Sequence, residues 1–146
     1  GAYLYGVSPS SAFEPAKPAV AFRARVAQAR MVKKGELVGY DDFHPLKRDT
    51  LVATISAGYV DGYPRKGGNG FVEINGYRSR VLGIACMDQM MADVTDAPSV
   101  RPGDVATLFG GGITLDEYAA LHDLNRNEAI STIGSRVPRV YKQLYD

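Results

Sequence analysis

The amino-acid sequence predicts a mainly β fold: a single barrel-like domain followed by two short C-terminal helices. Apolar and polar residues alternate over residues 20–26, and an Asn-Gly dipeptide at 75–76 separates two β-rich runs. A helical period occurs only in the last third of the chain. Short strands at close spacing favour a barrel or a sandwich. A chain of 146 residues, 45% of them hydrophobic, is long enough for one core.

The first strands are expected at residues 20–26 and 51–55. In the first run Val20, Phe22, Ala24 and Val26 share one face, which is typical of a half-buried strand. A turn at residues 33–35 interrupts the pattern, and residues 36–40 resume it, so this region is predicted to form a hairpin. Residues 8–19 hold prolines and serines without a period. We therefore assign residues 1–19 to a linker and 20–146 to the domain.

The second half of the predicted sheet is built around the Asn-Gly dipeptide. Residues 71–74 and 77–82 flank it, and Asn-Gly tolerates the positive φ angles of a type I′ turn. These two runs should therefore pair as a hairpin. Further strands are expected at residues 91–94 and 105–109.

The helical signals begin at Thr114. Thr114 and Glu117 have the spacing of a capping box, and the residues that follow form an apolar face of Leu115, Tyr118, Ala119 and His122. A second helix is predicted from about Asn127 to Ile133. Asn127 would be its N-cap, and Gly134 would take the left-handed conformation after its last turn.

Composition excludes several classes of function. The 17 basic and 16 acidic residues nearly cancel, and no basic run suggests a nucleic-acid surface. Cys86 is the only cysteine, so a disulfide within the chain is excluded and a reducing, cytoplasmic setting is expected. The two histidines have no metal-binding spacing. No apolar run approaches the ~20 residues that span a bilayer.

Two tyrosines, Tyr40 and Tyr59, follow glycines at the ends of predicted extended segments. A phenol becomes a base only where cations or hydrogen bonds stabilise its phenolate form. From residue type alone, either tyrosine is better interpreted as an aromatic residue at a barrel rim. Cys86 follows an apolar run and is interpreted as a packed residue rather than a nucleophile.

Five ordered segments together resemble the C-terminal domain of alanine racemases, which are fold-type III pyridoxal-phosphate enzymes. They are GAYLYG at 1–6, GY at 39–40, GYVDGYPR at 58–65, CMDQ at 86–89 and RVPR at 136–139. In that family a (β/α)8 barrel precedes this domain and binds the cofactor through a lysine. None of the six lysines of this chain lies in that motif. The resemblance thus implies a fragment that alone binds no pyridoxal phosphate and is inactive.

The resemblance implies racemisation by two opposed bases. In the family a lysine serves the D-enantiomer and a tyrosine serves the L-enantiomer, and the motif of that tyrosine is matched by Gly39 and Tyr40. Tyr40 is therefore the candidate catalytic residue. Where the family usually continues with glycine, this chain has Asp41 and Asp42, whose negative charge disfavours a neighbouring phenolate.

The same resemblance assigns binding and supporting roles. Tyr59 and Arg65 would border the access channel of the substrate, and the main chain of Met87 would contact the substrate carboxylate. Asp61 would support this region, and Arg139 would support the catalytic tyrosine by a hydrogen bond. Arg136 could instead be a plain surface charge. In the family these residues complete the active site of the other subunit of a homodimer.

Two positions depart from typical alanine racemases. Ile84 replaces an arginine that family members often carry, which removes a positive charge from the access channel. Asn127 occupies the place of a tyrosine that contacts the cofactor phosphate and crowds the substrate. Serine racemases of the vancomycin-resistance type resemble this chain in having asparagine there, so L-serine becomes a candidate substrate beside L-alanine. As an N-cap, Asn127 would have a purely structural role, and the two roles are compatible.

Two further functions remain open from the sequence. The missing lysine, Asp41 and Ile84 also fit a non-catalytic β-barrel that serves dimerisation or binding. An oligonucleotide-binding barrel has little support, because no basic stripe alternates with aromatic residues. The resemblance favours a racemase that supplies D-amino acids for peptidoglycan precursors, whose parent chain could also carry a membrane domain.

Overall fold

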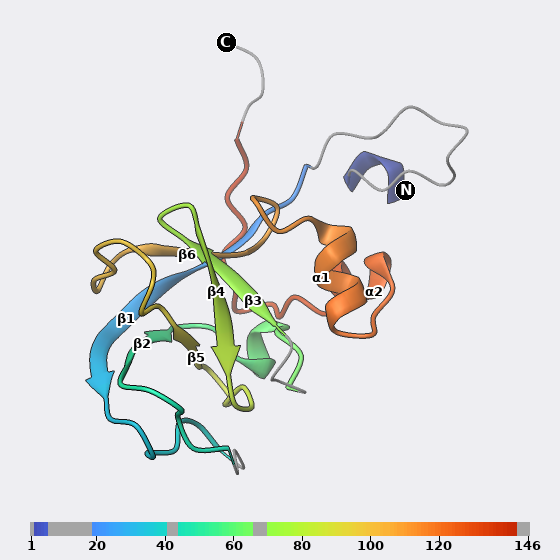
Figure 1. Ribbon diagram of the computed structural model, residues 1–146. Coiled ribbons are helices and arrows are strands. Elements are labelled where there is room, and N and C mark those ends of the chain that lie inside the picture. Colours follow the sequence, from blue (N-terminus) through green and yellow to red (C-terminus); the bar gives the residue numbers. More distant parts are fainter. Residues whose placement is uncertain (1, 6–18, 41–43, 66–69, 143–146) are drawn as a thin grey trace.

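The computed structural model describes residues 2–5, 19–40, 44–65 and 70–142. It contains six strands, two short α-helices near the C-terminal end and two 3-10 helices (Figure 1). The strands are β1 Phe22–Val32, β2 Thr50–Ile55, β3 Phe71–Ile74, β4 Tyr77–Leu82, β5 Met90–Asp93 and β6 Val105–Phe109. The helices are η1 Ala2–Tyr5, η2 Tyr59–Asp61, α1 Leu115–Leu121 and α2 Arg126–Ser131. Most of the expected linker lies outside the described residues.

The six strands form one closed barrel in the order β1-β2-β5-β4-β3-β6. Every pairing is antiparallel, and β6 closes the ring by pairing with both β3 and β1. The prediction of a mainly β, barrel-like domain with two C-terminal helices is confirmed. Closure leaves the residues that join the strands gathered at the rims of the barrel, and the pocket described below lies at one rim.

The β3–β4 hairpin forms as predicted. Asn75 and Gly76 both adopt positive φ angles, of 52° and 76°. Ile74 pairs with Tyr77 across the turn, and the register continues to the pair Phe71 and Arg80. The local turn chemistry therefore sets the pairing of these two strands.

The predicted hairpin of residues 20–40 is wrong. Strand β1 runs on to Val32 and pairs with β2 and β6, whereas residues 36–39 belong to no strand. Backbone hydrogen bonds instead join Leu46 to Gly35 and Glu36, at 2.8 and 2.9 Å. Strand β2 takes the place beside β1 in the barrel, and Tyr40 lies in the segment between these two strands.

The barrel interior is filled by apolar side chains from every strand. The largest fully buried ones include Val26, Ile55, Val72, Ile74, Val81, Met90, Leu108 and Phe109. Helices α1 and α2 lie side by side against this core (Figure 1). Thr114 caps α1 as predicted by accepting the Glu117 N–H at 3.1 Å, and Tyr118, Ala119 and His122 are buried.

The predicted start of the second helix needs a correction. Helix α2 begins at Arg126, and its N-cap is Asn125, which accepts the Glu128 N–H at 2.8 Å. Asn125 is favoured because it places Glu128 at the third helical position, where an acidic residue suits the helix dipole. Asn127 therefore lies exposed in the first turn and is not the cap.

Candidate active site

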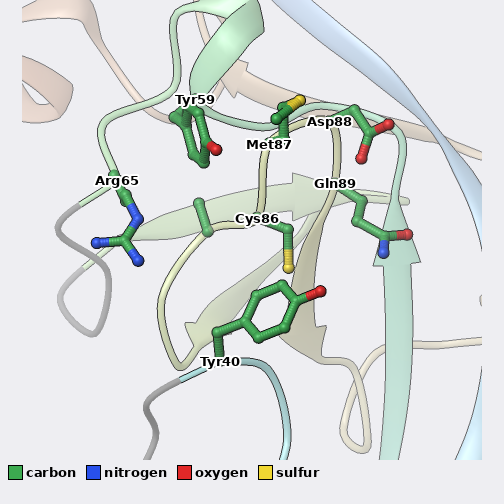
Figure 2. Close-up of a pocket in the computed structure, with 8 residues that line it drawn as sticks. Tyr40, Tyr59, Arg65, Cys86, Met87, Asp88 and Gln89 are labelled. Atoms are coloured by element: carbon green, nitrogen blue, oxygen red, sulfur yellow. The ribbon is translucent and has the colours of Figure 1, made fainter.

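Three separate segments meet around a pocket of about 380 Å³ at one rim of the barrel (Figure 2). Tyr40 comes from the segment between β1 and β2, Tyr59 from η2, and Met87 from the connection between β4 and β5. Eight residues line the pocket: Tyr40, Tyr59, Arg65, Ala85, Cys86, Met87, Asp88 and Gln89. Four of the residues that the sequence singled out are thus brought together.

Residues 86–89, here called the CMDQ turn, supply four of the residues that line this pocket. The Cys86 N–H donates to the Gln89 carbonyl at 2.9 Å, which closes the turn and leaves Met87 exposed. Among the described residues no acceptor takes the Met87 N–H. Met87 lines the pocket, and its amide is without an acceptor among the described residues, so it can donate to an anionic ligand.

Cys86, the first residue of the CMDQ turn, is a buried free thiol. Burial raises the pKa of this thiol, the nearby Asp88 raises it further, and Arg65 acts in the opposite direction. A thiol in such surroundings stays protonated and is a poor nucleophile. These surroundings agree with Cys86 as a packed residue.

Residues 58–63, here called the Tyr59 loop, lie directly on the CMDQ turn. The Tyr59 N–H donates to the Cys86 carbonyl at 3.0 Å, and the Val60 N–H donates to the Met87 carbonyl at 2.9 Å. A Cβ atom at Gly58 would lie only 2.3 Å from the Cys86 carbonyl oxygen. Only glycine permits this approach, which fixes Tyr59 beside Met87.

Tyr40 lies across the pocket from Tyr59, with Cys86 between them (Figure 2). A backbone bridge to Ile84 anchors Tyr40, and Gly39 turns the chain there with a φ of 86°. Tyr40 is 65% exposed. Its phenol is therefore held by the backbone yet open to a ligand. Asp41 and Asp42 lie outside the described residues.

Charge in the pocket comes from Arg65 and Asp88. Of the eight lining residues, Arg65 is the one with a positive charge, and Figure 2 shows it on the side of Tyr59. Ile84 does not line the pocket, although its backbone is paired with Tyr40. A carboxylate that entered here would find the Arg65 guanidinium and the Met87 N–H.

Asp61 lies behind the pocket wall. It is buried, and its carboxylate accepts hydrogen bonds from Arg136 Nε at 2.6 Å, Arg136 Nη2 at 3.0 Å and the Gly58 N–H at 2.9 Å. Burial acts to raise the pKa of Asp61, but the bonds from Arg136 and Gly58 outweigh it and hold this pKa below its usual range. The interpretation of Arg136 as a plain surface charge is therefore wrong.

The described residues show neither a metal site nor a membrane-spanning helix. Within residues 2–5, 19–40, 44–65 and 70–142, no three histidine, cysteine or acidic side chains gather as metal ligands. In the same ranges no helix is long and apolar enough to cross a membrane.

Comparison with known proteins gives the family. The family model described as "Alanine racemase, C-terminal domain" matches residues 19–141. The chain belongs to this family. Three of the five motifs of this alanine racemase C-terminal domain supply residues of the pocket.

Relatives of this alanine racemase domain are whole racemases. An alanine racemase of Desulforamulus reducens is 36% identical over 147 residues, covering 97% of this chain and 40% of that protein. A broad specificity amino-acid racemase of Vibrio vulnificus is 37% identical over 146 residues, covering 97% of this chain and 35% of that protein. The chain thus spans well under half the length of these relatives.

The fold is also that of solved alanine racemases. The crystal structure of the Bartonella henselae alanine racemase with covalently bound pyridoxal phosphate matches with a TM-score of 0.90 and 33% identity. That match covers 97% of this chain and 40% of the solved one. The described barrel is therefore the C-terminal part of an alanine racemase fold.

Three predicted site residues of this alanine racemase domain lie outside the pocket: Asp61, Asn127 and Arg139. The Arg139 guanidinium donates to the carbonyls of Gly134, Val137 and Ile133 at 2.6 to 2.8 Å. It therefore fastens the segment after α2, and no hydrogen bond from it to Tyr40 occurs among the described residues.

Sequence reasoning missed the pairing of Asp61 with Arg136 in this alanine racemase domain. The two residues are 75 positions apart in the chain, so no local pattern joins them. The signal that could have suggested the pair is the presence of one acidic residue in the GYVDG motif and two arginines in the RVPR motif.

Proposed function

We propose that this domain works in a pyridoxal-phosphate-dependent racemase that interconverts the L- and D-enantiomers of alanine, serine or both. Tyr40 would be the base on the L face of the substrate. The observation that supports this function most directly is the pocket, in which Tyr40, Arg65 and Met87 converge from three segments. A phenol, a cation and an N–H without a protein acceptor suit an amino-acid substrate.

The pocket fits one wall of a cofactor site rather than a whole one. It offers phenols, a guanidinium and a main-chain donor, but none of the eight described lining residues is a lysine. We infer that a barrel domain of the parent chain provides the lysine and the phosphate contacts. Pyridoxal phosphate, when bound there, supplies the electron sink that makes the α-proton of an amino acid acidic.

In this proposal each residue of the chain has a separate task. The Met87 N–H donates to the substrate carboxylate, and Arg65 attracts that carboxylate toward the pocket. The Tyr40 oxygen takes the α-proton of the L-enantiomer, and the protonated phenol returns a proton to the same face in the reverse direction. Tyr59 limits the width of the access channel.

A homodimer accounts for the openness of the site. Tyr40 is 65% exposed and Met87 57% exposed, and a rim this open would not exclude water from a proton transfer. The proposal therefore has the pocket of one chain facing the cofactor barrel of the other, in a cytoplasmic enzyme. This arrangement is supported by the exposure of the residues that would carry out the reaction.

Serine as a substrate is proposed from Asn127. Because Asn125 caps α2, capping does not account for an asparagine at position 127. An exposed amide there could reach a partner and hydrogen-bond a hydroxymethyl group. The relative of Vibrio vulnificus, a broad specificity amino-acid racemase, supports a family site that accepts more than one amino acid.

The test is racemisation by the parent protein that includes the cofactor barrel. We expect turnover of L-alanine, L-serine or both, and a loss of about 10²- to 10⁴-fold in Tyr40→Phe because a general base is removed. Tyr77→Phe is the matched control, since Tyr77 is also exposed but lies outside the pocket. Bound cofactor without any racemisation would instead support a non-catalytic dimerisation or binding module.

A further inference from the structure

The Tyr59 loop is held on two sides. One side lies on the CMDQ turn through the hydrogen bonds of the Tyr59 and Val60 amides. The other side lies on the segment that follows α2, where the Gly134 N–H donates to the Asp61 carbonyl at 3.0 Å. The Tyr59 loop thus lies between the CMDQ turn, which binds substrate in our proposal, and the segment that follows α2, here called the C-terminal segment.

The contact with the C-terminal segment is backbone against backbone. A Cβ atom at Gly62 would lie 2.6 Å from the Ile133 Cα and from the Thr132 carbonyl oxygen. A Cβ atom at Gly134 would lie 2.4 Å from the Val60 carbonyl oxygen. Such closeness leaves no room for side chains between the two backbones at these two glycines, and polar groups join the two segments beside them.

The strongest of these polar groups are Asp61 and Arg136. The side chain of Asp61 is 9% exposed, and Arg136 meets it with two parallel N–H donors. The second carboxylate oxygen also accepts the Gly58 N–H, which begins the Tyr59 loop. One carboxylate therefore ties the start of the loop to the C-terminal segment, and Arg136 neutralises it.

We propose that Arg136 is a positioning residue for the pocket, acting through Asp61 to keep Tyr59 and Met87 in place. The proposed racemase function enters this inference only through its kinetic consequence. Without Arg136 the buried carboxylate keeps one backbone donor and loses its counter-charge, so the Tyr59 loop separates more easily from the CMDQ turn. Lysine in its place keeps the charge but not the two-pronged geometry.

Amide hydrogen exchange tests this inference without any enzymatic assay. In Arg136→Gln we expect the Tyr59 and Val60 amides to exchange about tenfold faster, while amides of the β3–β4 hairpin change less than about twofold. Arg136→Lys should give an intermediate rate at the same two amides. Arg48→Gln is the matched control, because it removes an ion pair with Asp96 and Asp93 away from the pocket.

Two results of the exchange experiment would overturn the inference. Equal acceleration at all amides would mean that Arg136 only stabilises the whole fold, and unchanged rates at Tyr59 and Val60 would mean that it does not hold the loop. If Arg136→Gln fails to fold, Arg136→Lys carries the same comparison against Arg48→Gln.

Kinetics of the parent enzyme give the second readout. Because Met87 would bind the substrate carboxylate and Tyr59 would border the access channel, and neither would move protons, Arg136→Gln should raise KM about five- to tenfold with kcat within about twofold. A fall in kcat at unchanged KM would contradict a positioning role. If the parent does not racemise amino acids at all, only the proposed function fails, and the exchange result still decides the role of Arg136.

Discussion

Burial in the core shifts the pKa values of three aromatic residues, Tyr63, Tyr118 and His122. The rings of Tyr63, Tyr118 and His122 pack together in the core, with centroids 4.6 to 6.1 Å apart. Neither phenol oxygen and neither imidazole nitrogen has a hydrogen-bond partner among the described residues. Burial raises the pKa of both tyrosines and lowers the pKa of His122 to about 4.

This cluster predicts a pH dependence of stability. In the unfolded chain His122 ionises with a pKa of 6.5, against about 4 when folded, so between these values the unfolded state binds more protons. The contribution of His122 to the free energy of unfolding should therefore be fully present above pH 6.5 and be lost as the pH falls toward 4. Denaturant unfolding at a series of pH values measures this slope.

Two variants isolate the contribution of His122. His122→Phe should flatten the slope between pH 6.5 and 4, because no group then gains a proton on unfolding at this position. Tyr118→Phe is the control and should leave the slope between pH 6.5 and 4 unchanged, since burial raises the pKa of this phenol further above that range. An unchanged slope in His122→Phe would show that other groups cause the pH dependence.

At the scale of elements, local chemistry was predictable and long-range pairing was not. The β3–β4 hairpin and the cap of α1 follow from residues within four positions of each other. The prediction that residues 36–40 pair with the first strand was wrong, because β1 pairs instead with β2, which lies farther along the chain. Asn125 and Asn127 both have a side chain that can cap a helix. Asn125 is the cap because its side chain accepts the Glu128 N–H.

The two asparagines of α2 give a matched pair of variants. Asn125→Ala should lower the free energy of unfolding by about 1 kcal/mol, because the Glu128 N–H loses its acceptor. Asn127→Ala should change it by less than about 0.5 kcal/mol, since the residue is an exposed, non-capping position. Thermal or denaturant unfolding measures both, and equal losses would contradict the assigned cap.

At the scale of the whole molecule, barrel closure decides which residues meet. β6 joins β3 to β1, and this closure holds the rim on which three connecting segments converge. The motifs predicted that Tyr40, Tyr59, Arg65 and Met87 share a site, because their order resembles a family. They could not place Asp61 against Arg136, since a contact between residues 75 positions apart depends on the completed fold.

In the proposed function the chain would supply half of a reaction geometry. Tyr40 would be the L-face base and the Met87 amide would bind the carboxylate, while the opposite base would lie in a separate domain of the parent. A two-base mechanism makes the two half-reactions separable, because each base exchanges only the proton on its own face. Removal of Tyr40 should therefore affect the enantiomers differently before a full turnover is complete.

The most direct test is α-proton exchange in deuterated water, followed by NMR on the parent enzyme with each enantiomer of alanine. In Tyr40→Phe, deuterium incorporation into L-alanine should fall by about 10²-fold or more, whereas incorporation into D-alanine with retained configuration should stay within about tenfold of the unsubstituted enzyme. Equal rates for both enantiomers, either both preserved or both lost, would contradict Tyr40 as the base that serves the L face.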